Sequence, residues 1–175
     1  ITFSQETDLN KINWKKYDVD YVFECTGKFN SKEKLLPHIH NGAKKIIVSA
    51  PCKNADKTIV FGVTESEIKK NDKIISAASC TTNAIVPVLK IMNDKYQINS
   101  GHIETVHSYT NDQNLIDNYH KGDRRGRSAA LNMVITSTGA VKAVAKAIPE
   151  LESKLTGNAI RVPTPNVSLA VLVLN

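Results

Sequence analysis

The feature that most constrains the fold is a short apolar segment, a helical segment and a second apolar segment in succession. Residues 20–25 form the first apolar segment, which ends at the turn Thr26-Gly27, and residues 45–50 form the second. The stretch between them, about residues 30–40, predicts a helix that starts with capping-box spacing. Two strands joined through a helix run parallel, because a tight hairpin joins only antiparallel strands. The sequence therefore predicts an α/β fold with a parallel sheet.

Further apolar segments extend this pattern and then change it. Short strands are predicted at residues 58–63 and 74–76, and a helix is predicted from Cys80 to about residue 96. A strand is predicted at residues 103–107, followed by a long polar stretch at 110–127 and an amphipathic helix at 138–148. A strand stub at 160–162 and a buried strand at 167–174 complete the chain. The change to longer, separated strands predicts a domain boundary near residues 76–80.

Both ends of the chain predict that it is part of a larger fold. The chain opens at Ile1, which is not a methionine, on an alternation of apolar and polar residues. It closes on the apolar run 167–174, which is typical of a strand that needs neighbours. We therefore expect a fragment.

Composition limits the compartment and the partners. Cys25, Cys52 and Cys80 are odd in number and unevenly spaced, which fits neither a disulfide framework nor a zinc site and predicts reduced thiols in the cytoplasm. We expect no bound metal. Because no apolar run approaches the length of a membrane span, we expect no membrane-spanning segment. The formal net charge of +6 predicts anionic partners.

Cys80 is the strongest candidate for a catalytic residue. It follows Ser79 at the predicted start of a helix, where unpaired backbone N–H groups and the helix dipole favour an anion. A thiol in this position is expected to have a lowered pKa and to act as a nucleophile. The alternative is a buried cysteine beside an ordinary cap. Ligands bind beyond the carboxyl ends of strands in open α/β sheets, and three predicted strands end at Thr26-Gly27, Ser49-Ala50 and Ser79-Cys80, which favours the catalytic interpretation.

A nucleophilic thiol needs a base, and His107 at the end of a predicted strand is the best candidate, although a structural histidine is the alternative. Arg161 lies in an apolar strand and must be paired or face a ligand, and its planar guanidinium suits phosphate. Thr138-Gly139 at a predicted helix start offers backbone donors for a second anion.

Basic side chains also gather in the long polar stretch. They are Lys121, Arg124, Arg125 and Arg127. A solvated loop and an anion site both explain such a cluster, whereas the scarcity of aromatic residues beside it argues against nucleic acid.

Taken together, these segments resemble phosphorylating glyceraldehyde 3-phosphate dehydrogenase over essentially the whole chain. The matching runs are Ser79-Cys80-Thr81-Thr82-Asn83, Thr105–Thr110, Ser137–Ala140, Ala159–Val167, Glu24–Phe29 and Ser49-Ala50-Pro51. The resemblance implies the end of a Rossmann-type parallel sheet in residues 1–78 and part of an α+β catalytic domain in residues 79–175. It also implies a homotetramer, with the polar stretch up to about Ile135 acting as an S-shaped loop between subunits.

The resemblance implies a reaction and assigns residues to it. The Cys80 thiolate would attack an aldehyde, and His107 would act as base as a hydride leaves for the nicotinamide. Inorganic phosphate would then release an acyl phosphate from the thioester, as in glycolysis or gluconeogenesis. The implied cofactor contacts are Thr26, Gly27, Ser49 and Ala50. The cofactor is NAD, with NADP left open, because the glycine-rich loop and the acidic ribose-binding residue of the family are absent from this chain.

Two anion sites follow from the same resemblance. Thr110 and Arg161 resemble the site for the substrate phosphate, with Asp112 near the ribose. The residues that resemble the inorganic-phosphate site are Ser79, Thr81, Thr138, Gly139 and Arg125. An erythrose 4-phosphate dehydrogenase has similar catalytic residues and is one alternative. A binding protein that uses the basic loop, or an inactive fragment, is another.

Overall fold

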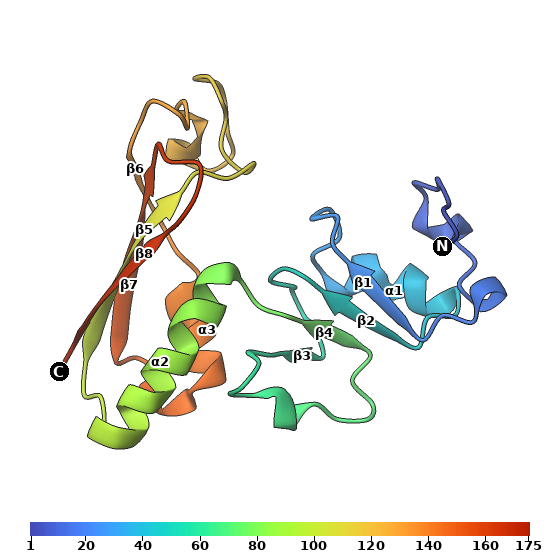
Figure 1. The fold of residues 1–175 in the computed structure, drawn as a ribbon, viewed down its shortest axis with the longest axis horizontal. Helices are drawn as coiled ribbons and strands as arrows, with labels where there is room; N and C mark the ends of the chain where they lie inside the picture. Colours follow the sequence, from blue (N-terminus) through green and yellow to red (C-terminus); the bar gives the residue numbers. More distant parts are fainter. The chain divides into compact units, whose positions relative to one another are not determined.

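The computed structural model describes residues 1–175, apart from the side chain of Asp123, and these residues form two compact units (Figure 1). The first unit spans residues 1–83 and the second spans residues 84–175. In the first unit the elements are β1 (Tyr21–Glu24), α1 (Lys32–His40), β2 (Lys45–Val48), β3 (Lys57–Thr58) and β4 (Ile74–Ser76), with short 3-10 helices before β1 and between β3 and β4.

The first unit is built on a parallel sheet with the strand order β1-β2-β4-β3. Its apolar core is formed by side chains from the strands and from α1, and it includes Val22, Leu35, Ile46, Val48 and Ile74. The strands are short, and apart from Glu24 and Ser76 at strand ends their buried positions are β-branched or aliphatic, as expected for a sheet covered by a helix. The predicted α/β class and the parallel strand–helix–strand unit are confirmed.

Two local predictions in this unit are wrong. The strand predicted at residues 58–63 stops at Thr58, because the chain turns when Thr64 accepts the backbone N–H of Val60 through its hydroxyl oxygen at 2.9 Å. The capping box predicted before α1 does not form either. Ser31 occupies the cap position of α1, and the Glu33 carboxylate accepts the side-chain amide of Asn54 at 3.0 Å.

Helix α2 (Cys80–Tyr96) starts in the last residues of the first unit and continues in the second, as its apolar periodicity predicts. The other elements of the second unit are β5 (Gly101–Ser108), β6 (Val134–Thr136), α3 (Ala140–Ala147), β7 (Leu155–Val162) and β8 (Leu169–Leu174). They form a mixed sheet with the order β6-β7-β5-β8, in which β5 and β7 are parallel and the outer strands are antiparallel to them. A helix-covered mixed sheet fits the predicted α+β class.

Gly157 allows close packing of α3 on β7. A Cβ atom at this position would lie 2.7 Å from the backbone oxygen of Ile103 and 2.8 Å from Cγ2 of Val141. Both distances are shorter than real carbon contacts, so only glycine fits between β5 and α3 here. The packing buries Ile103, Val144 and Ala159.

The last two strands differ from the prediction. The stub predicted at residues 160–162 is the end of an eight-residue strand that starts at Leu155, because β7 pairs with β5 along its whole length. The final strand was predicted to be buried, yet β8 lies at the edge of the sheet and 59% of Leu169 and 63% of Val173 are exposed. Among the described residues, no helix is long and apolar enough to cross a membrane.

Candidate active site

The carboxyl ends of β1 and β2 are joined through Glu24. One oxygen of its buried carboxylate accepts the backbone N–H of Thr26 at 2.8 Å and also the Thr26 hydroxyl. Its backbone oxygen accepts the backbone N–H of Ser49 at 3.0 Å. Glu24 therefore fixes two of the four positions for which cofactor contacts are expected. Gly27, with φ of 73°, completes the turn in a conformation that favours glycine.

An aromatic pair lies beside this carboxylate, with His38 buried and Trp14 half-buried. His38 on α1 is 3% exposed, its Nδ1 accepts the indole N–H of Trp14 at 2.9 Å, and its Nε2 lies 3.6 Å from the second oxygen of Glu24. Burial lowers the pKa of His38, and the hydrogen bonding and charge of Glu24 oppose that shift only in part. No role for His38 is predicted from the sequence, because a histidine on a helix that looks surface-exposed carries no local signal of its partners.

The connection from β4 to α2 is tightly held before Cys80. The Ser76 hydroxyl donates to the backbone oxygen of Ala50 at 2.8 Å and accepts the backbone N–H of Ala78 at 3.2 Å. Ala78 is buried with φ of 60°, a left-handed conformation that costs a non-glycine residue about 1–2 kcal/mol. Strain of this kind is common where a chain must present a functional side chain.

Cys80 is the first residue of α2, and its thiol is exposed. The Ser79 hydroxyl accepts the backbone N–H of Thr82 at 3.1 Å and lies 2.8 Å from the Thr82 hydroxyl oxygen, so Ser79 caps the helix. The backbone oxygen of Ser79 also accepts the N–H of Asn83 at 2.9 Å. The predicted position of the thiol at a helix start is confirmed. Its catalytic role stays a prediction.

His107 and Arg161 are register partners on β5 and β7. Nη1 of Arg161 lies 2.9 Å from Nδ1 of His107, 3.0 Å from the backbone oxygen of Ser108 and 3.4 Å from the Thr110 hydroxyl oxygen. Nδ1 of His107 also lies 2.7 Å from the Ser108 oxygen. Parallel pairing of the two strands thus brings together the residues expected to be the base and the substrate-phosphate site.

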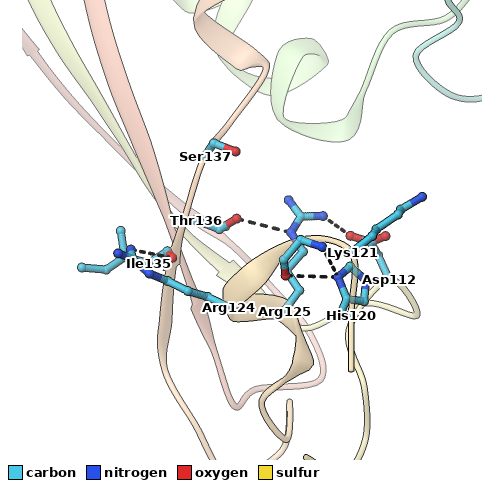
Figure 2. A pocket seen from close by; sticks show the side chains of 9 residues that line it. Asp112, His120, Lys121, Arg124, Arg125, Ile135, Thr136 and Ser137 are labelled. Carbon is cyan, nitrogen blue, oxygen red and sulfur yellow. Dashed lines mark hydrogen bonds and ion pairs between the residues drawn. The ribbon is translucent and has the colours of Figure 1, made fainter. Parts of the chain in front are cut away.

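Basic side chains of the long polar stretch line a cavity of about 470 Å³ (Figure 2). Figure 2 shows Arg125 between Asp112 and Thr136, where it forms an ion pair with the Asp112 carboxylate and donates from Nε to the Thr136 hydroxyl at 3.3 Å. Arg124 donates to the backbone oxygen of Ile135 at 3.2 Å. The cavity carries more positive than negative charge, and sequence reasoning missed the pairing of Arg125 with Asp112.

The other expected anion-binding residues lie at two helix starts. Thr81 is in the first turn of α2, and Gly139 precedes α3, where the Thr138 hydroxyl accepts the backbone N–H of Ala140 at 3.1 Å. A Cβ atom added to Gly139 would meet no atom within 4 Å, so the space beside this helix start is open. Cys80 belongs to the unit of residues 1–83 and His107 to the unit of residues 84–175, and their pairing stays a prediction.

An exposed thiol thus lies at a capped helix start in the unit of residues 1–83, and a histidine–arginine pair lies on the mixed sheet of the unit of residues 84–175. Residues 79–175 match a family model described as the C-terminal domain of glyceraldehyde 3-phosphate dehydrogenase. Because that match covers more than half of the chain, the chain belongs to the glyceraldehyde 3-phosphate dehydrogenase family, as the sequence motifs predicted.

Curated relatives extend the similarity over nearly all of the chain. A glyceraldehyde-3-phosphate dehydrogenase-like protein of Pseudomonas aeruginosa is 60% identical over 96% of this chain and 37% of its own length. The glyceraldehyde-3-phosphate dehydrogenase of Clostridium pasteurianum is 49% identical over 96% of this chain and 51% of its own length. Glyceraldehyde-3-phosphate dehydrogenase 1 of Bacillus subtilis is 51% identical over 99% of this chain and 52% of its own length. The chain thus spans about half or less of the length of these relatives.

Proposed function

We propose that this chain carries the catalytic thiol of a phosphorylating dehydrogenase that oxidises glyceraldehyde 3-phosphate. The observation that carries the proposal is the position of Cys80, exposed and first in α2, with Ser79 capping the helix. A helix start stabilises a thiolate, because the free N–H groups and the dipole favour negative charge. The names of the curated relatives support the same activity.

The proposed reaction uses two residues of the chain directly. The Cys80 thiol gives its proton to Nε2 of His107, and the thiolate forms a carbon–sulfur bond to the aldehyde carbon. The carbonyl oxygen takes that proton from Nε2, which gives a thiohemiacetal. Nε2 of His107 takes the hydroxyl proton of this intermediate as its hydride departs, which leaves a thioester on Cys80. An oxygen of inorganic phosphate then attacks the thioester carbon, and the Cys80 thiolate leaves as an acyl phosphate is released. The nicotinamide cofactor, when bound, supplies the hydride acceptor.

The edge of the parallel sheet fits such a cofactor. Thr26, Gly27 and Ser49 are exposed where β1 and β2 end, and a Cβ atom added to Gly27 would meet no atom within 4 Å. A small, open turn at this position lets a nucleotide approach the backbone closely. We assign Thr26, Gly27, Ser49 and Ala50 to cofactor binding, with NAD as the cofactor and NADP left open.

Two groups of residues are assigned to phosphate. Arg161 and Thr110, whose side chains are hydrogen-bonded at 3.4 Å, take the phosphate of the aldehyde. The inorganic-phosphate site draws on Ser79, Thr81, Thr138, Gly139 and Arg125. Arg125 is paired with Asp112 here, so binding inorganic phosphate requires this cation to exchange one partner for another.

The wider setting of the chain is proposed with the reaction. Residues 1–78 complete a dinucleotide-binding domain and residues 79–175 belong to a catalytic domain. The protein is a cytoplasmic homotetramer in which the polar stretch up to about Ile135 lies near the cofactor of a neighbouring subunit. The exposed apolar side chains of that stretch, Leu115, Ile116 and Leu131, support an interface there.

The test uses the full-length protein and follows cofactor reduction with glyceraldehyde 3-phosphate, with and without inorganic phosphate. We expect Cys80→Ser to abolish the reaction, whereas Cys25→Ser, which removes another exposed thiol, keeps it. Erythrose 4-phosphate is assayed in parallel, and faster turnover of this aldehyde would assign the related activity instead. No thiol-dependent oxidation of either aldehyde would contradict the proposal and favour a binding protein.

A further inference from the structure

Nδ1 of His107 has two neighbours that require opposite states of that nitrogen. Nη1 of Arg161 lies 2.9 Å away and the backbone oxygen of Ser108 lies 2.7 Å away. A guanidinium nitrogen can only donate a hydrogen bond and a carbonyl oxygen can only accept one. Nδ1 must therefore be unprotonated, or bare, to accept a hydrogen bond from Arg161, and protonated to donate one to the Ser108 oxygen. A single neutral ring cannot do both, so the site has two alternative arrangements.

The two arrangements differ at the other ring nitrogen. A neutral imidazole carries one proton, so a bare Nδ1 leaves the proton on Nε2, and a protonated Nδ1 leaves Nε2 bare. A bare Nε2 can accept a proton, whereas a protonated Nε2 can only donate a hydrogen bond. The contact with Arg161 thus stabilises the form of His107 that cannot act as a base through Nε2.

We propose that Arg161 couples phosphate binding to the tautomer of His107: a phosphate monoester that draws the Arg161 guanidinium away from Nδ1 leaves His107 with its proton on Nδ1 and a bare Nε2. This inference rests on the proposed function, because it deepens the assignment of His107 as base and of Arg161 as phosphate ligand. In this scheme Arg161 is a positioning residue for His107 as well as a ligand for the substrate phosphate.

The surrounding contacts prepare both arrangements. The Ser108 oxygen lies within hydrogen-bond distance of both Nη1 and Nδ1, so it accepts the Nδ1 proton once the guanidinium leaves. Nη1 also reaches the Thr110 hydroxyl, which lies beyond the end of β5, so the guanidinium already has a partner in that direction. Charge-assisted bonds to phosphate oxygens are stronger than a bond to a neutral ring nitrogen, which favours the exchange.

The coupling acts in both directions. A ligand shifts an equilibrium only by its difference in affinity for the two states, and here the phosphate monoester binds better when Nδ1 is protonated. An aldehyde without a phosphate group therefore meets His107 mostly with Nε2 protonated. We expect such a substrate to show a lower kcat as well as a higher KM, whereas loss of a simple binding contact would raise KM alone.

The experiment observes the tautomer without any turnover. Full-length protein with 15N-labelled histidine is studied by NMR at one fixed pH above the usual titration range of histidine. His107 is assigned by comparison with His107→Gln. We expect the Nε2 signal to change from that of a protonated nitrogen to that of a bare nitrogen when glycerol 3-phosphate saturates the protein. Glycerol, which lacks the phosphate, should cause no change.

Three results would overturn the coupling. They are an unchanged Nε2 signal at saturation, a doubly protonated ring in the complex, and absence of glycerol 3-phosphate binding in a direct titration. Arg161→Ala should show a bare Nε2 before any ligand is added and no response to it. If this variant does not fold, the comparison of wild-type protein with and without ligand still decides. The NMR experiment involves no oxidation of an aldehyde, so its result does not depend on the dehydrogenase assay. A protein that fails to oxidise triose phosphate would contradict the proposed function but not the coupling.

Discussion

The indole N–H of Trp14 donates to Nδ1 of His38 across 2.9 Å, so the buried ring is neutral and carries its proton on Nε2. That proton points toward the Glu24 carboxylate, whose nearer oxygen is 3.6 Å away. The other oxygen of Glu24 holds the turn at Thr26. His38, which lies on α1, therefore faces the carboxylate that holds the turn proposed for cofactor binding.

This arrangement predicts that acid destabilises the fold through His38. Its pKa is lowered by burial, whereas in the unfolded chain it returns to about 6.5. As pH falls below that value the unfolded chain takes up a proton that the folded chain refuses, so stability that is complete above about pH 6.5 is lost toward the lowered pKa. The slope is at most about 1.4 kcal/mol per pH unit. Urea unfolding of the full-length protein at a series of pH values measures it.

His38→Gln keeps an acceptor for Trp14 but cannot titrate, so this variant should lose most of that slope. His40→Gln is the matched control, since His40 lies on the same helix and is exposed. Equal slopes in wild type and His38→Gln would remove His38 as the source of the acid sensitivity.

Local periodicity was sufficient to predict the elements whose buried residues repeat within one segment. Strands β1, β2 and β4 and helix α2 are of this kind. The strand predicted at residues 58–63 has the same apolar composition, but the hydroxyl of Thr64 captures a backbone N–H and the chain turns. The exposure of β8 was also missed, because its burial depends on a neighbour beyond the edge of the sheet and not on its own residues.

In the candidate site, too, features set by local sequence could be predicted, whereas contacts between distant segments could not. Ser79 and Cys80 could be placed at a helix start, since a cap and the apolar repeat after it are local signals. The contact of His107 with Arg161 depends on the register of β5 against β7, across 54 residues of sequence, and no local pattern encodes it. The pairing of Arg125 with Asp112 was missed for the same reason.

Ser79→Ala should destabilise α2, because it removes the hydroxyl that accepts the backbone N–H of Thr82. A lost helix cap costs about 0.5–2 kcal/mol in the free energy of unfolding, which urea titration measures. Ser79→Asp should recover that loss, since a carboxylate caps well and suits the positive end of the helix. Ser100→Ala, at an exposed serine outside the helices, serves as control. A Ser79→Ala variant as stable as this control would show that the cap does not contribute.

Gly157→Ala should destabilise the packing of α3 on β7. The added Cβ would lie 2.7 Å from the backbone oxygen of Ile103, so the helix or the strand must move. Such overpacking costs about 1–3 kcal/mol, and a fall in thermal midpoint would reveal it. Gly139→Ala is the matched control for stability, because its Cβ meets open space and its φ of −83° suits alanine. Similar midpoints for the two variants would contradict this packing.

Asp112→Asn should lower the concentration of inorganic phosphate that gives half-maximal rate, because it releases Arg125 from its ion pair. A partly exposed pair contributes about 0–1 kcal/mol, so the expected change is up to about fivefold. Asp117→Asn breaks a comparable exposed pair with Arg127 and should leave this concentration unchanged. If both Asp112→Asn and Arg125→Gln leave the dependence of the rate on inorganic phosphate unchanged, Arg125 does not belong to the phosphate site.

Thr26→Val should weaken both the fold and cofactor binding. The Thr26 hydroxyl donates to the buried Glu24 carboxylate and accepts the backbone N–H of Lys28 at 3.1 Å. A hydrogen bond to a charged group contributes about 1.5–3 kcal/mol, so urea unfolding should show a loss of that order. The apparent dissociation constant of NAD should rise as the inverse of the fraction of molecules whose turn keeps the binding conformation.

Thr26→Ser separates this positioning effect from loss of the methyl group, because serine keeps the hydroxyl and should restore both quantities. Titration calorimetry with NAD and urea unfolding of the same three proteins give the comparison. The two effects must move together, since the same bond to Glu24 holds the turn before and after the cofactor binds. A Thr26→Val variant that is destabilised but binds NAD as tightly as wild type would limit Thr26 to folding and remove this turn from the cofactor site.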